Sequence, residues 1–229
     1  MDTFVIFGAV HTVRATRALA YDRGRWATPL GDIEIDETLT DEILSEAPDL
    51  IHVDLDGHRR EHSIEVQVPF IQYFYPDARI VPMLVPPISQ ADQVGRAVAR
   101  VLQRTDKITV CLGSSDLTHY GPSYGFTPMG TGAEGFRWAR EKNDEFFINL
   151  ALSMEAEKIV ESAQLYGSAC GPGAVAAVMA VARDLGCEKG RLLAHTTSAD
   201  IIETKFFQKS ADSVGYAGII YGLEKTNSN

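Results

Sequence analysis

The chain of 229 residues is 45% hydrophobic and 23% charged, a composition typical of globular proteins and unlike that of disordered or fibrous ones. Acidic residues exceed basic ones by 31 to 21, and the net charge of -10 disfavours nucleic acid as a partner because the phosphate backbone is itself anionic. No segment approaches the roughly 18 consecutive apolar residues of a membrane span, so we expect none. The first eight residues show neither a basic region nor a cleavage pattern, so we expect no secretion signal there. Three cysteines do not make a disulfide framework, and a cytoplasmic protein with free thiols is therefore predicted.

Short apolar runs alternate with amphipathic stretches, and their lengths predict strands and helices. In chain order, the first half predicts a strand at 4–7, a helix at 36–47, a strand at 50–53, a helix at 64–74 kinked by Pro69, a strand at 79–85, a helix at 89–104 capped by Ser89, and a strand at 108–112. The second half predicts a surface loop at 120–133, helices at 134–150, 156–165 and 172–185, strands at 192–197 and 214–221, and a frayed polar tail at 224–229. This alternation predicts a single α/β domain with a mainly parallel sheet covered by helices on both faces.

The strongest chemical signal follows the strand at 108–112. In such a fold, functional groups gather beyond the carboxyl ends of strands, and Asp116 and His119 occupy that place. Asp116 is predicted to orient His119 and raise its basicity. The alternative is a turn in which Asp116 caps a helix and His119 packs nearby.

Cys170 lies two residues before Pro172, at the start of a predicted helix, where a thiolate is favoured. It is therefore a candidate metal ligand or nucleophile, and its alternative role is that of a small buried apolar residue. Cys111 and Cys187 are interpreted as structural.

The remaining histidines are weaker candidates. His11 follows the first strand and is as compatible with a core position as with a site, and His62 lies where it faces either solvent or the crevice. We interpret His52 and His58 as structural or solvated, and we give His195, in a late strand, no functional role. The glycine pattern at 130–135 matches a dinucleotide-binding loop, but no strand is predicted to precede it, so it is discarded.

Several blocks together resemble one family. They are FVIFGAVH at 4–11, TPLGD at 28–32, EHSIEVQVPF at 61–70, SSDLTHYG at 114–121, CG at 170–171 and SVGYAG at 213–218. In this order they resemble the Memo family, called AmmeMemoRadiSam system protein B in bacteria and archaea. The family is similar in fold to LigB-type extradiol dioxygenases, so the resemblance implies a LigB/Memo-like domain over residues 1–229.

The resemblance also implies a non-haem metal site. His11 matches a metal histidine, Cys170 matches a cysteine ligand, and Asp116 and His119 match the pair beside the metal, with His119 as the acid–base group. Glu61 and His62 match a segment near the same pocket. The chain begins after the family's earlier strand that carries the first metal histidine. Either the start is truncated or the chain represents a shortened subfamily, and His62 is a candidate replacement ligand.

Three functions remain open from the sequence. The first is a metal-dependent oxygenase or redox protein that uses iron(II), or copper, on a small aromatic or phenolic substrate. The second is a metal-free hydrolase or transferase with Cys170 as nucleophile, His119 as base and Asp116 as orienter. The third is a non-catalytic module that binds a peptide, or the radical SAM and AMMECR-type partners that the bacterial name implies, without a metal. An exposed sheet edge would also favour a homo-oligomer.

Overall fold

In the computed structural model, which describes residues 1–222, the chain folds into two units. The first unit comprises Met1–Ser115 and Gly171–Leu185, and the second comprises Asp116–Cys170 and the residues from Gly186 onward. The prediction of one domain over 1–229 stays a prediction, and the polar tail predicted at 224–229 lies outside the described residues. Within residues 1–222, no helix has both the length and the apolar character that crossing a bilayer requires.

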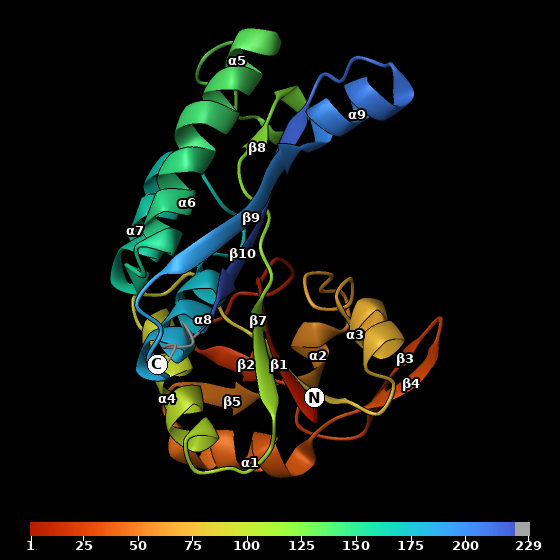
Figure 1. Cartoon of the computed structure of the whole chain (residues 1–229), viewed down its shortest axis with the longest axis vertical. Coiled ribbons are helices and arrows are strands. Elements are labelled where there is room, and N and C mark those ends of the chain that lie inside the picture. The colour runs from red at the N-terminus through yellow and green to blue at the C-terminus, as the bar shows by residue number, and fades with distance from the viewer. Residues whose placement is uncertain (223–229) are drawn as a thin grey trace, which may run out of the picture. The chain divides into compact units, whose positions relative to one another are not determined.

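A five-stranded sheet forms the centre of the first unit (Figure 1). Its strand order is β5-β2-β6-β1-β7, with β1 parallel to both of its neighbours and β2 antiparallel to β6. These strands are β1 (Thr3–Gly8), β2 (Ala18–Ala20), β5 (Ile51–Val53), β6 (Arg79–Leu84) and β7 (Thr109–Gly113). Every residue of β1 is buried, as its uninterrupted apolar run requires for a central strand.

Helices and a hairpin cover the two faces of this sheet. The side chains of Phe4 and Ile6 pack with Val68 and Ile71, which belong to the segment around α3 (Val68–Phe74). Because strand side chains alternate, Val5 and Phe7 face the opposite side, on which α8 (Pro172–Asp184) contacts β1 and β7. The remaining elements of the unit are the hairpin β3 (Arg25–Thr28) and β4 (Gly31–Glu34), and the helices α1 (Glu37–Glu46), α2 (Leu55–His58) and α4 (Ala91–Leu102).

The contact between α4 and α8 depends on glycine. A Cβ placed at Gly95 in α4 would lie 2.0 Å from the carbonyl oxygen of Ala177 in α8, so the two backbones approach too closely for any larger residue. Alanine-rich α8 can pack at this distance because its side chains are equally small.

The second unit is built on a three-stranded antiparallel sheet of order β8-β10-β9. In Figure 1 the long strands β9 and β10 run beside α6 and α7. The strands are β8 (His119–Tyr120), β9 (Gly190–Thr197) and β10 (Ser213–Tyr221). The helices are the short 3-10 turn Pro122–Tyr124, α5 (Ala133–Trp138), the π-helical segment Ala139–Asp144, α6 (Glu145–Leu152), α7 (Ala156–Tyr166) and α9 (Ser198–Phe206).

The mixed α/β class with a mostly parallel central sheet is confirmed, and most predicted elements occur within one to three residues of their expected bounds. The predicted start of α3 and the predicted cap of α4 were wrong. Helix α3 begins at Val68 rather than at residue 64, so Pro69 occupies its first turn and does not kink it. Helix α4 begins at Ala91, and Ser89 makes no capping bond to it, since its hydroxyl donates to Gln90 instead.

The predicted helix at 134–150 is divided by the π-helical segment. The predicted loop at 120–133 begins with the end of β8 and a 3-10 turn, and Tyr120 within it is fully buried. Short elements escaped prediction because three or four residues show no clear periodicity; they are β2, the β3–β4 hairpin, α2 and β8. The nine-residue helix α9 was also missed, and none of its residues is buried.

Candidate functional site

Asp116, His119 and Cys170 come together in the second unit. One ligand atom from each, a carboxylate oxygen, an imidazole nitrogen and the thiol sulfur, lies within 4.8 Å of the other two. The Nε2 atom of His119 is 3.3 Å from Oδ2 of Asp116, and both side chains are partly exposed. The site is therefore open to a small ligand.

Backbone contacts fix the position of the thiol. The amide N–H of Asp116 donates to Sγ of Cys170 over 3.3 Å, and the amide N–H of Cys170 donates to the carbonyl oxygen of Asp116 over 3.2 Å. This reciprocal pair joins two segments that lie 54 residues apart in the chain. Neither bond involves the carboxylate of Asp116.

His119 is positioned from its own strand. It opens β8 and lies opposite Val214 of β10. Its ring also packs against the ring of Tyr124, with centroids 4.9 Å apart. Burial, together with the charge of Asp116 and the nearby Tyr124, raises the pKa of the Tyr216 phenol. Neither tyrosine was predicted from the sequence, because no motif links it to His119.

A second cluster, in the first unit, contains His11, Glu61 and His62 (hereafter the Glu61 cluster). Glu61 is buried, and its Oε1 accepts from Nδ1 of His11 over 2.8 Å and from the amides of His62 and Ser63, while its Oε2 accepts from the amide of His11 over 2.7 Å. The rings of His11 and His62 stack, with centroids 4.8 Å apart.

Hydrogen bonds keep Glu61 ionised. Burial alone would raise its pKa, but donation from the ring and amide of His11 and from the amide of Ser63 lowers the pKa to about 2. The carboxylate in turn holds the proton of His11 on Nδ1, which leaves Nε2 as the atom with a coordinating lone pair. Carboxylates commonly orient metal-binding histidines in this way.

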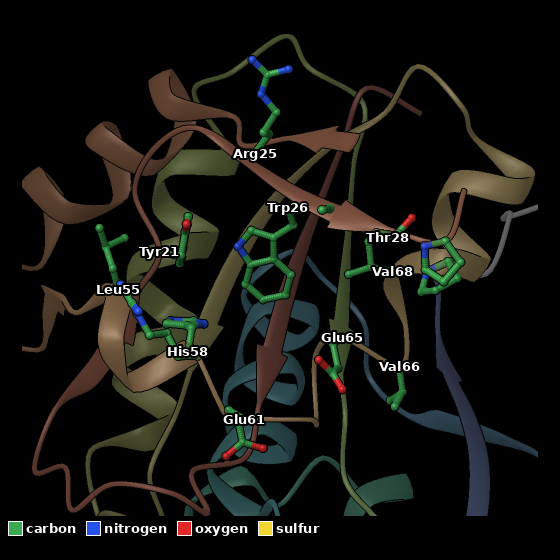
Figure 2. A pocket seen from close by; sticks show the side chains of 14 residues that line it. Tyr21, Arg25, Trp26, Thr28, Leu55, His58, Glu61, Glu65, Val66 and Val68 are labelled. Carbon is green, nitrogen blue, oxygen red and sulfur yellow. The ribbon is translucent and has the colours of Figure 1, made fainter. Parts of the chain in front are cut away.

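The predicted residues thus fall into two sets. Asp116, His119 and Cys170 are adjacent in the second unit, and His11, Glu61 and His62 are adjacent in the first. His11 belongs to the first unit and Cys170 to the second, and a metal ion shared by the two residues stays a prediction. Glu61 also lines a cavity of about 560 Å³ in the first unit, whereas His62 is not among the residues lining that cavity (Figure 2).

Two other histidines have defined structural partners. His58 is buried in α2 rather than solvated, and its Nε2 bonds the carbonyl oxygen of Leu19 over 3.1 Å. His195 pairs through Nε2 with Oδ2 of buried Asp144 over 3.1 Å. The spacing of this pair, 51 residues, gave no signal in the sequence.

All three cysteines are free thiols, as predicted. Desolvation raises the pKa of Cys111 in β7 to about 12 and also raises that of buried Cys187. Both are therefore poor thiolates, and Cys170 has the best geometry for chemistry.

Comparison with known proteins identifies the family. A sequence model of the family described as Memo-like protein matches residues 1–220. The chain belongs to this Memo family. The MEMO1 family protein of Thermococcus onnurineus is 32% identical over 228 residues, which cover 96% of this chain and 76% of that protein. The MEMO1 family protein of Pyrococcus abyssi is 34% identical over 229 residues with the same coverage, and that of Pyrobaculum aerophilum is 32% identical over 223 residues, covering 96% of this chain and 72% of its own length.

Memo-family membership confirms the resemblance read from the ordered blocks. The blocks that carry Asp116 and His119, Cys170, His11 and Glu61 all lie within the matched residues. Both candidate clusters therefore lie within the residues that the family model matches.

Proposed function

We propose that this Memo-family protein is a metal-dependent redox protein or oxygenase that acts on a small aromatic or phenolic substrate. The observation that supports it is the cluster of Asp116, His119 and Cys170, whose ligand atoms lie within 4.8 Å of one another. Cys170 supplies a thiolate donor that suits iron(II) or copper(I), and the His119–Asp116 pair lies beside it as the acid–base group.

Each residue has a distinct part in this proposal. Cys170 is the thiolate ligand, and the amide of Asp116 donates a hydrogen bond that a thiolate accepts better than a thiol does. His119 takes the proton of a phenolic hydroxyl, with the Asp116 carboxylate as its positioning partner. Iron(II), when bound, supplies the activation of O₂ toward the aromatic ring. His11, oriented by Glu61, is the second ligand that the family resemblance implies.

Anaerobic purification followed by elemental analysis and oxygen-uptake assays on catechols tests the proposal. The wild-type protein should contain iron or copper and consume oxygen. Cys170→Ala should lose the metal, whereas His119→Ala should keep most of it and lose oxygen uptake. Cys187→Ala is the matched control and should behave as wild type. Turnover by a metal-free sample would refute the proposal.

A second candidate is a metal-free hydrolase or transferase, which the Asp116–His119 contact also favours. A base that is oriented by a carboxylate and lies beside a thiol is the arrangement of a cysteine nucleophile. Here an acyl or alkyl group would remain covalently attached to Cys170 during turnover. Intact-mass analysis after incubation with p-nitrophenyl acetate separates the two candidates. Only a protein in which Cys170 is the nucleophile becomes acetylated at that residue and turns over without metal.

The partner assignments rest on the family resemblance. We also propose a peptide ligand, radical SAM and AMMECR-type partners, self-association and a cytoplasmic location. If Cys170→Ala and His119→Ala keep partner binding and no phenol is turned over, the protein is a binding module. Size-exclusion chromatography with light scattering measures self-association directly.

A further inference from the structure

The cavity of about 560 Å³ lies entirely within the first unit (Figure 2). The β3–β4 hairpin supplies Trp26, α2 supplies His58, and the segment that follows α2 supplies Glu61 and Glu65. The hairpin is held in place by a hydrogen bond from Thr28 to Gln72 of α3. A volume of this size is typical of a small-molecule site, and the rigid frame indicates that it is preformed.

Aromatic rings form one wall of the cavity. The ring of Tyr21 meets that of Trp26 edge to face, with centroids 5.5 Å apart, and the ring of His58 lies 5.6 Å from Tyr21 and 5.9 Å from Trp26. Burial lowers the pKa of His58 to about 4, so this ring is uncharged at neutral pH. The wall therefore offers π surface and no positive charge.

The charged side chains that line the cavity differ in whether they form ion pairs. Arg25 and Arg59 each bond a neighbouring aspartate, with Arg25 3.2 Å from Asp32 and Arg59 2.8 Å from Asp56. In Figure 2 the Arg25 side chain extends away from the Trp26 ring. Glu65, in contrast, makes no ion pair with any residue in 1–222.

Glu61 adds a second carboxylate. Its hydrogen-bond donors are the ring of His11 and backbone amides, with no arginine or lysine among its partners in residues 1–222. Figure 2 shows Glu61 and Glu65 on the side of the cavity toward which the Trp26 ring points. An anionic ligand would meet two carboxylates and two arginines that are already paired.

We propose that this cavity binds a small organic ammonium ion whose apolar body packs against Trp26 and Tyr21 and whose charged nitrogen faces Glu65 and Glu61. Aromatic faces attract cations through the ring quadrupole, and nearby carboxylates strengthen that attraction. The net charge of -10 further favours a cation over an anion. All residues that line this binding site belong to the first unit, and the test of binding requires no metal.

Three compounds of one shape test the charge requirement. They are 2-phenylethylammonium, neutral 2-phenylethanol and anionic 3-phenylpropionate. The chain has two tryptophans, so the indole N–H signals of Trp26 and Trp138 are assigned in NMR spectra with Trp138→Phe, and the second serves as an internal reference. The ammonium compound should shift the Trp26 signal in a saturable way, and isothermal titration should give an affinity that exceeds those of the other two.

Glu65→Gln is the decisive variant because Glu65 is exposed and its loss should leave the fold intact. It should weaken binding of the ammonium compound by about fivefold, as expected for a partly exposed charge pair. Glu42→Gln, an exposed change of the same charge on α1, should leave the affinity unchanged. Trp26→Leu should weaken binding by about tenfold. Equal or tighter binding of the alcohol or the carboxylate, or equal affinities for the Glu65 and Glu42 variants, would overturn the proposal.

Discussion

The amide of Asp116 donates a hydrogen bond to the sulfur of Cys170, 3.3 Å away, and the amide of Cys170 returns a bond to the carbonyl oxygen of Asp116 over 3.2 Å. Because both bonds involve the backbone, the sulfur keeps its place when the Asp116 side chain is changed. Mutations of Asp116 can therefore remove the carboxylate without removing the bonds to Cys170. The reaction rate of the Cys170 thiol then reports on its environment in the site.

Cys170 should react with iodoacetamide at pH 7.5 at least about tenfold faster than the other two cysteines. Burial raises the pKa of Cys111 to about 12 and also raises that of Cys187, so few of these thiols are ionised. Peptide mass spectrometry over time gives the three rates. Added iron(II) under argon should protect Cys170 alone. Equal rates at all three cysteines would contradict this interpretation.

Glu61→Gln should lower metal affinity by roughly 10- to 100-fold if His11 is a ligand. The substitution replaces one oxygen with an NH₂ group, so the ring or amide of His11 loses its acceptor and the imidazole is no longer held with its proton on Nδ1. Competition with a chromophoric chelator measures the affinity for iron(II). Glu42→Gln, on the exposed face of α1, is the matched control. An unchanged affinity would remove Glu61 from the metal site.

The sequence predicted the central strands well because their apolar runs are long enough to require burial. The run at 4–7 became β1, which is fully buried and parallel to both of its neighbours, and the helix predicted at 36–47 became α1. Elements of three or four residues, such as β2 and α2, depend on contacts with distant segments, which no local pattern records.

The residues of the candidate site also differ in how far a local sequence pattern could predict them. Asp116 and His119 are three residues apart after a strand, so a local motif revealed them. Cys170 was noticed through its helix, but its contact with Asp116 spans 54 residues and depends on the tertiary fold. The Asp144–His195 pair spans 51 residues and was missed altogether. Glu61 was placed near a pocket by resemblance, whereas its four hydrogen bonds become visible only in the structure.

Acid should destabilise the first unit partly through His58. Burial lowers its folded-state pKa to about 4, against about 6.5 in the unfolded chain, so the unfolded state binds the extra proton between these values. The stability that neutral, buried His58 contributes is fully present above about pH 6.5 and is lost as the pH falls toward 4. The loss in the free energy of unfolding amounts to about 2 kcal/mol by pH 5. Urea unfolding at pH 7 and pH 5 measures the loss. His58→Gln, which keeps a donor for Leu19, should lose about 2 kcal/mol less over the same interval, and an equal loss would contradict the assignment.

Asp144→Ala should destabilise the second unit by about 3 kcal/mol. Burial raises the pKa of Asp144, and its carboxylate still accepts from the Thr118 amide over 3.0 Å and from Nε2 of His195 over 3.1 Å, so removal leaves two buried donors without an acceptor. Asp144→Asn keeps one oxygen acceptor and should cost about 1 kcal/mol. Urea unfolding followed by circular dichroism gives these values. Asp200→Ala, which removes an exposed partner of Arg140, is the control and should cost less than about 1 kcal/mol. If the Asp144 and Asp200 variants are equally stable, the buried pair does not support the sheet that carries His119.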